Sequence, residues 1–171
     1  MNYTETVLRQ DFPVFGCNHF AYAITGELMK VEIFALCDAA TEFMGKLNLL
    51  GTFDSIGARE TPASHPACGI ALRIRFDRIE SGEHRIRMEL VNADGQAVVP
   101  PLETTANVQI PDGMPSAAIN LIVNFQQLKF ETFGDYSIDL AIDGRHESSL
   151  PLYVREMPNM PAPERDPHAS N

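Results

Sequence analysis

The sequence contains no tryptophan, only three cysteines, and no apolar run near the roughly 20 residues that a membrane-spanning helix needs. Basic residues are also scarce, since 13 Lys and Arg face 23 Asp and Glu and the formal net charge is −10. An acidic surface repels phosphate backbones and anionic lipids, so we expect no nucleic-acid partner and no membrane partner. With no Trp and four Tyr, the aromatic platforms that carbohydrate enzymes use for sugar stacking are also missing.

The N-terminal residues do not resemble a secretory leader. The first ten residues carry Glu5 and a single basic residue, Arg9, and no apolar stretch follows a positive region. An odd cysteine count without a leader is typical of reduced, mostly buried thiols, so we expect a cytoplasmic protein. A Cys37–Cys68 disulfide stays open as an alternative, because both residues fall in neighbouring predicted strands.

What the sequence does contain is a series of short apolar/polar alternations between Lys30 and Val154, interrupted by Gly, Pro, Asn and Asp. Alternation with a period of two is typical of strands with one buried face, and the interrupting residues are those that favour turns. About eight strands with little helix predict an all-β protein, an immunoglobulin-like antiparallel β-sandwich. The stretch 38–45 is ambiguous, because Ala39 to Met44 could also form one helical turn.

Local motifs place the turns and the strand pairs. Asn92 to Gly95 and Asp143-Gly144 have the composition of hairpin turns. Phe133 to Ile138 is similar to the entry of the penultimate strand of immunoglobulin-like sandwiches, where an inward Tyr forms a corner hydrogen bond. A hairpin around residues 81–83 is also predicted. It would pair apolar Phe76 with Met88, Asp77 with Arg87, and Arg75 with Glu89.

The chain divides into three zones by its pattern. Residues 1–28 show no clear period and are either an arm lying over the sandwich or an extension before a domain that starts at Met29, the reading we favour. Residues 29–155 hold the strands and form the predicted sandwich domain. Residues 156–171 are rich in proline and polar residues, so we expect a disordered tail.

Two stretches are familiar in combination. The first runs from Met29-Lys30-Val31-Glu32 through Cys37-Asp38-Ala39-Ala40 to Lys46–Asp54, and the second from Gly134-Asp135-Tyr136 through Asp143-Gly144 to Leu150–Val154. Together they resemble a family of small bacterial proteins known only as a domain of unknown function, over about residues 29–155. The resemblance implies a single-domain bacterial β-sandwich and supports Met29 as the domain start. It implies no activity, cofactor or catalytic residue.

The most concentrated cationic feature is a predicted arginine ladder. In the hairpin predicted around residues 81–83, Arg73, Arg75, Arg85 and Arg87 would share one outer sheet face. Such a face could bind an acidic peptide, a phosphate or a second subunit. The alternative is a solvated face balanced by Asp77 and Glu89. These four arginines are the candidate partner-binding residues.

Motifs for chemistry are weak. His65 and Cys68 in one segment and Cys17 and His19 in another could together supply the four ligands of a zinc site. Carboxylates in the predicted loops could gather around calcium, but Asp is also a favoured turn residue. No G-x-S-x-G is present, and Ser148, Ser149, His146 and Asp143 would lie on one hairpin, whereas a catalytic triad joins separate segments.

The sequence therefore favours a non-enzymatic binding or assembly module that acts through protein–protein contacts, with an unknown protein or a second copy as the partner. No cofactor is expected. The alternative is a calcium- or zinc-dependent binding protein or enzyme whose site lies in the sandwich loops.

Overall fold

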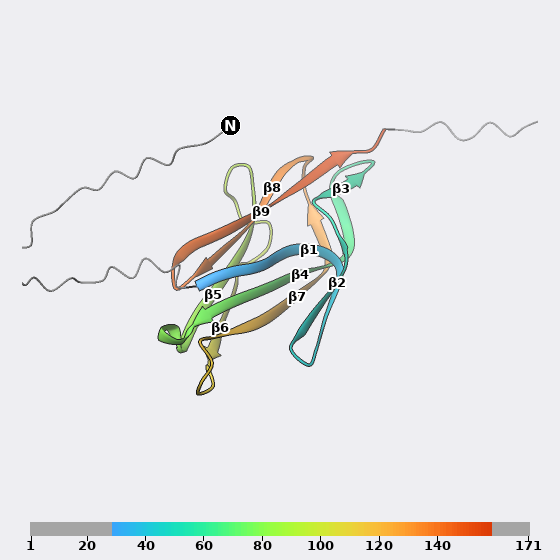
Figure 1. Ribbon diagram of the computed structural model, residues 1–171. Helices are drawn as coiled ribbons and strands as arrows, with labels where there is room; N and C mark the ends of the chain where they lie inside the picture. The colour runs from blue at the N-terminus through green and yellow to red at the C-terminus, as the bar shows by residue number, and fades with distance from the viewer. Residues whose placement is uncertain (1–28, 159–171) are drawn as a thin grey trace, which may run out of the picture.

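The computed structural model describes residues 29–158, which form nine strands and one short 3-10 helix (Figure 1). The alternating pattern that predicted strands is the cause, because it gives each strand one face to bury. In chain order the elements are β1 (Met29–Phe43), β2 (Lys46–Thr52), β3 (Ser55–Ala58), β4 (Ala63–Asp77), η1 (Arg78–Glu80), β5 (Gly82–Asn92), β6 (Leu102–Val108), β7 (Ser116–Phe130), β8 (Gly134–Ile142) and β9 (Arg145–Glu156). The predictions made for residues 1–28 and 159–171 lie outside the described residues.

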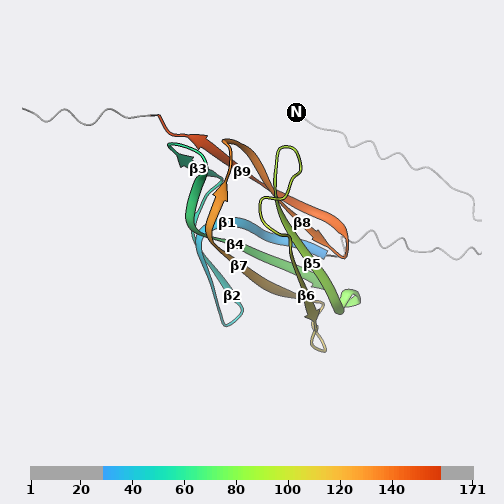
Figure 2. The ribbon, with the colours of Figure 1, turned by 180° about the vertical axis from the view of Figure 1, so that it is seen from behind.

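The strands form two sheets that pack face to face. Sheet A has the order β2-β1-β4-β7 and sheet B the order β3-β9-β8-β5-β6. Figure 2 shows β5, β6 and β8 of sheet B from the rear, with β1, β4 and β7 of sheet A crossing them. All neighbours are antiparallel except β3 and β9, which run parallel. The predicted all-β sandwich is confirmed.

The topology is immunoglobulin-like. The neighbours β1-β4-β7 in one sheet and β5-β8-β9 in the other match the A-B-E and C-F-G strands of that fold. The predicted tyrosine corner is also present: the hydroxyl of Tyr136 donates to the backbone carbonyl of Thr132 over 2.7 Å. The Tyr136 ring meets Phe130 edge-on, with ring centroids 5.0 Å apart. The corner therefore fixes the entry of β8 against the end of β7.

The core lies between the two sheets and is built from the inward residues of the alternating strands. Each fully buried Ile, Leu or Phe contributes about 1.5–3 kcal/mol, so this layer dominates the stability of the fold. Its largest fully buried members are Phe76, Phe130, Ile70, Leu72, Ile74, Ile86, Leu140, Leu152, Val108 and Val154.

The predicted hairpin around residues 81–83 is wrong. β4 lies in sheet A and β5 in sheet B, so Phe76 does not pair with Met88, and both enter the core from opposite sheets. The turn η1 carries the chain across, and the Glu80 carboxylate caps it by accepting from the backbone N–H of Asp77 at 2.9 Å. Two inward-facing strands satisfy the same apolar pattern whether they are neighbours or face one another, so the pattern could not separate these arrangements.

The possible helical turn over residues 39–44 is also absent, since β1 continues to Phe43. β2 pairs with this part of β1 from Cys37↔Thr52 to Phe43↔Lys46. Alanines have a high helix propensity, but the ladder hydrogen bonds of a hairpin override it here.

The alternative disulfide does not form, and Cys37 and Cys68 are both free thiols. Cys37 lies opposite Gly69 in the β1–β4 ladder, so Cys68, one residue earlier, points to the other face of sheet A. Cys68 belongs to the core between the sheets, whereas Cys37 is buried outside that core. The two thiols are therefore separated by the sheet itself.

Candidate functional site

The four arginines of the predicted ladder lie on two different sheets. Arg73 and Arg75 belong to β4 in sheet A, whereas Arg85 and Arg87 belong to β5 in sheet B. The outer faces of a sandwich point in opposite directions, so these residues cannot form one binding face. The predicted single cationic surface is wrong because the chain changes sheets between the two pairs.

Glu32 neutralises the half of the ladder on sheet A. The β1–β4 register shifts between Val31 and Ile33, so Glu32 is the extra residue of a β-bulge. Its carboxylate oxygens accept from Nε of Arg73 at 2.7 Å and from Nε of Arg75 at 2.5 Å. The hydrogen bond from Arg75 is the main cause that holds the pKa of Glu32 below its ordinary value, against the opposing effect of burial. Both guanidinium groups are thus already paired internally.

The half on sheet B borders a hollow of about 490 Å³ that has mixed charge. Arg87 pairs with Glu89, and its Nε lies 3.4 Å from the Glu103 carboxylate. The lining residues are Glu83, Arg85, Arg87, Glu103, Ala141, Asp143 and Gly144. Three carboxylates offset two guanidinium groups there, so the hollow has no net attraction for an acidic ligand.

His84 bridges two elements beside this hollow. Its Nδ1 lies 2.7 Å from Asp143 Oδ2, and its Nε2 lies 2.7 Å from the backbone carbonyl of Glu80. Both partners are acceptors, so both ring nitrogens donate in the imidazolium form. Burial lowers the pKa of His84, but the hydrogen bonds to Glu80 and Asp143 outweigh it and the pKa is raised overall.

A serine, a histidine and an aspartate also meet on the outer face of sheet B. Ser149 Oγ lies 2.8 Å from His146 Nε2 and donates to Asp139 Oδ1 over 2.7 Å. In a catalytic triad the acid orients the histidine, and the histidine accepts the serine proton. Here the hydroxyl of Ser149 donates its hydrogen bond to the Asp139 carboxylate, so His146 is not placed to accept the serine proton as a base. Asp143, which lies close to His146 in the sequence, pairs with His84 instead.

The residues considered as alternative metal ligands do not gather in the described range. Among residues 29–158 no three His, Cys, Asp or Glu side chains converge as metal ligands, and Cys17 and His19 lie outside that range. His65 packs against Phe53, with ring centroids 5.4 Å apart, and its Nε2 is buried without a hydrogen-bond partner. Burial, with smaller effects of Cys37 and Asp38, raises the pKa of the Cys68 thiol to about 11. Cys68 is therefore a neutral core residue.

The gap between the sheets is too small for a ligand. Its apolar lining comes from both sheets, including Val123, Phe125, Val99 and Leu102, but the enclosed volume is about 20 Å³. That volume holds about one water molecule, far less than the several hundred Å³ of ligand pockets.

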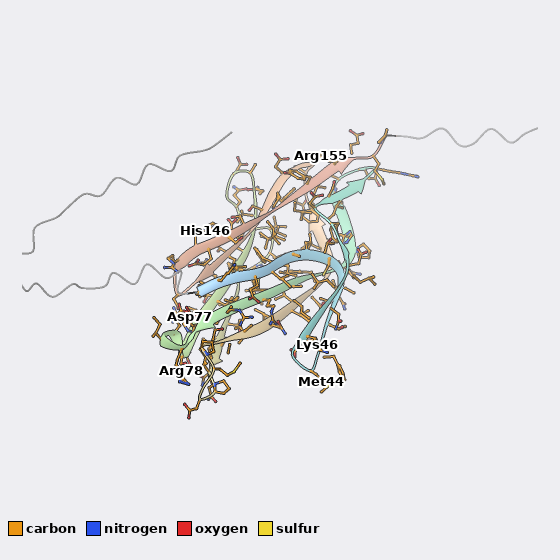
Figure 3. All side chains as sticks on the ribbon, in the orientation of Figure 1. Met44, Lys46, Asp77, Arg78, His146 and Arg155 are labelled. Atoms are coloured by element: carbon orange, nitrogen blue, oxygen red, sulfur yellow. The ribbon has the colours of Figure 1, made fainter. Side chains whose placement is uncertain are left out.

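Three of the four most exposed large apolar side chains among residues 29–158 lie on the β1–β2 hairpin. Phe43 is 70% exposed, Met44 81% and Leu50 69%. Figure 3 shows Met44 and Lys46 at the end of this hairpin, far from His146 and Arg155. Large apolar side chains that cluster on a surface mark contact sites for other proteins. Sequence reasoning missed this group because the segment was read as a possible helical turn.

The turn of this hairpin has an unusual residue. Phe43 pairs with Lys46, so Met44 and Gly45 form a two-residue loop, with φ of 52° and 74°. Such loops favour Asn or Asp before Gly, because positive φ costs other side chains free energy. The β8–β9 turn has the same geometry with the favoured pair, Asp143-Gly144, at φ of 52° and 80°. The sequence signal that could have indicated this turn is the glycine at position 45, which directly follows Met44.

The hairpin is held against the outer face of sheet A. The side-chain amide of Asn120 on β7 donates to the backbone carbonyl of Gly45 over 3.1 Å. The hairpin is therefore positioned before any partner binds.

The described residues contain no helix long and apolar enough to cross a membrane. Three solved structures resemble the chain at low identity. The alkylpurine DNA glycosylase AlkC of Pseudomonas fluorescens is 7% identical with a TM-score of 0.45, and the match covers 76% of this chain and 31% of that one. A β-glucuronidase of glycoside hydrolase family 2 is 18% identical with a TM-score of 0.33, and the match covers 56% of this chain and 10% of the glucuronidase. An immunoglobulin-like protein of Pseudomonas aeruginosa is 11% identical with a TM-score of 0.34, and the match covers 76% of this chain and 100% of that protein.

The chain thus spans about a third of the glycosylase and a tenth of the glucuronidase, and none of these likenesses exceeds the fold. No curated protein matches the sequence. A family model does match over residues 32–155, which include nearly all of the strands and confirm the resemblance found from the sequence. The chain belongs to DUF6941, a family of unknown function.

Proposed function

We propose that this domain is a non-enzymatic protein-binding module whose contact surface is the β1–β2 hairpin, with Phe43 and Met44 at its tip and Leu50 further along β2, opposite Ala39. The observation that carries the proposal is Met44, which is 81% exposed at a positive-φ position that another residue would fill at lower cost. A residue that is unfavourable for the fold and apolar toward solvent is expected where function selects it.

The exposed apolar side chains would contribute to binding as part of a larger interface. Burying one of them contributes about 1.5–3 kcal/mol, so three contribute about 4.5–9 kcal/mol, a gain of the same order as the cost of association, and the polar residues around them must supply the rest. Phenylalanine and methionine are also enriched in interface cores.

The fixed position of the hairpin supports the same role. Pairing of β1 with β2 and the hydrogen bond from Asn120 to Gly45 order the tip in the free protein. An ordered tip loses less conformational entropy on binding than a loose loop. Lys46 next to the tip and Glu42 before it give a mixed polar rim, as interfaces commonly have.

The test is a pull-down from the native cell with the wild type and with a Phe43→Ser, Met44→Ser double variant. We expect the amount of partner recovered to be at least tenfold lower with the double variant, because the variant removes most of the exposed apolar area of the hairpin. Far-UV circular dichroism verifies that the variant keeps its sheets.

The matched control is Ile79→Ser on η1. Ile79 is 70% exposed, like Phe43, but lies at another part of the molecule. It should leave partner recovery unchanged. Equal recovery by wild type and the hairpin variant would contradict the proposal, and equal loss with Ile79→Ser would indicate non-specific adhesion.

A further inference from the structure

β7 (Ser116–Phe130) is a 15-residue edge strand of sheet A. It pairs with β4 along its length, and in the described part of the chain no strand pairs with its other side. An antiparallel strand bonds one neighbour through alternate residues, so the remaining N–H and C=O groups point away from the sheet. A long edge of this kind is a template for another strand.

The other edge strands carry protective features that residues 118–126 of β7 lack. β3 has four residues, and β6 has seven, includes Glu103 and follows Pro100-Pro101. β2 has seven residues and begins with Lys46. Short length, charge and proline all discourage edge-to-edge pairing. In contrast, residues 118–126 of β7 contain no charged residue and no proline.

We propose that residues 118–126 pair with the same residues of a second copy of this chain, antiparallel and about a two-fold axis at Ile122. The two four-stranded A sheets would then form one continuous sheet. This inference rests on the proposed protein-binding function and extends it to a second surface, the β7 edge, which adjoins the hairpin tip at Asn120.

The inner face of β7 is self-complementary in this register. Leu121 and Val123 lie opposite the core residues Leu72 and Ile70 of β4, so both face the core side of sheet A. A two-fold axis through Ile122 places Leu121 opposite the partner's Val123. Both are only half-buried in one copy, and each would be covered by the other. Cross-strand apolar pairs of this kind stabilise sheets.

The outer face matches as well. Asn120 and Asn124 lie opposite Arg73 and Gly69, so both point away from the core. The same axis places Asn120 opposite the partner's Asn124. Asn120 already donates one N–H to the Gly45 carbonyl and accepts from Arg73. A side-chain amide has two N–H donors and an oxygen with two lone pairs, so the remaining ones can form hydrogen bonds across the junction.

Charge permits this contact although the chain carries a net charge of −10. At physiological ionic strength charges are screened beyond about 8 Å, so the groups nearest the junction decide. β7 has no acidic residue, and its one charged residue is Lys129. In the proposed register Lys129 lies near the partner's Ser116, the end of the strand that follows the exposed Asp112.

Sedimentation equilibrium of the full chain tests the proposal. We expect a concentration-dependent dimer for the wild type, and a monomer for Val123→Lys, whose charge would be buried at the junction but can reach solvent from a free edge. The matched control is Thr104→Lys, a half-buried inner-face position of the edge strand β6, which should keep the dimer. Thermal unfolding verifies that both variants fold.

Cross-linking provides a readout that does not depend on Val123→Lys folding. In a Cys17→Ser background, Ile122→Cys should form a disulfide between two copies, because only the residue on the axis faces itself. Asn124→Cys should cross-link only when mixed with Asn120→Cys. A wild type that stays monomeric at high micromolar concentration, or a β7 edge occupied by a different protein, would overturn the proposal. The hairpin variant Phe43→Ser, Met44→Ser should stay dimeric, so failure of this inference and failure of the proposed function are separable.

Discussion

His84 and Asp143 are joined by a 2.7 Å contact that ties the start of β5 to the β8–β9 turn. The other carboxylate oxygen of Asp143 accepts from the backbone N–H of Arg85 at 2.8 Å. The imidazole also lies against the Phe76 ring, with centroids 4.4 Å apart, and bonds the carbonyl that ends η1. One imidazole side chain thus connects both sheets at the crossing point of the chain.

The stability of this connection should depend on pH. The folded state raises the pKa of His84, so its contribution is complete below about pH 6.5, the ordinary value, and is lost as the pH rises through the raised pKa. The pKa of Asp143 is lowered: burial opposes this but is outweighed by the hydrogen bonds from His84 and Arg85, so its contribution is lost only in acid. We expect His84→Gln to cost about 1–2 kcal/mol at pH 6 and less at pH 9.

The measurement is the thermal midpoint of wild type and His84→Gln from pH 5 to 9. Replacing the ring also removes packing on Phe76, which gives an offset that does not change with pH. The part of the difference in thermal midpoint that changes with pH reports the His84–Asp143 contact. Asp143→Asn should reduce this pH-dependent part of the stability in the same way. Parallel curves for wild type and His84→Gln would rule out the connection.

Met44→Asn should separate stability from binding. Asn tolerates the positive φ of this turn better than Met, so we expect a gain of about 1 kcal/mol in the free energy of unfolding. The same substitution removes the most exposed apolar side chain, so partner recovery should fall. Urea unfolding and the pull-down measure the two effects. A loss of stability would show that the methionine fits its turn better than the backbone geometry indicates.

Glu32→Gln should weaken the outer face of sheet A. The amide cannot satisfy the guanidinium groups of both Arg73 and Arg75, so we expect a loss of about 1 kcal/mol at neutral pH. The pKa of Glu32 is lowered, so the wild-type contribution is present above about pH 4.3 and is lost as the pH falls through the lowered value. Urea unfolding at pH 7 and pH 3 measures this, with Glu103→Gln on β6 as a more exposed control. Equal losses at both pH values would contradict the ion-pair explanation.

Tyr136→Phe should destabilise the domain without altering its core packing. The variant keeps the ring contact with Phe130 but leaves the Thr132 carbonyl without the hydroxyl donor. We expect a cost of about 1 kcal/mol. Thermal unfolding measures it, and Tyr153→Phe on β9 is the control. A variant as stable as the wild type would mean that water replaces the corner hydrogen bond at no cost.

Much of the fold could be predicted from the sequence because strand alternation and turn chemistry are local. The Tyr136 corner, the Asp143-Gly144 turn and the two-sheet sandwich all followed from patterns a few residues long. The position of the arginines did not follow. Arg75 and Arg87 alternate with core residues equally well whether β4 and β5 pair side by side or face one another across the core.

Period-two alternation by itself determined which side chains of this chain face inward, and hence that two sheets must stack to bury them. Only the tertiary structure decided which strand belongs to which sheet, because that choice depends on contacts between residues far apart in the chain. Such distant contacts also decided two local features: the bulge that turns Glu32 toward Arg73, and the position of the hairpin that exposes Met44. Both depend on how distant strands meet, and no local pattern records that.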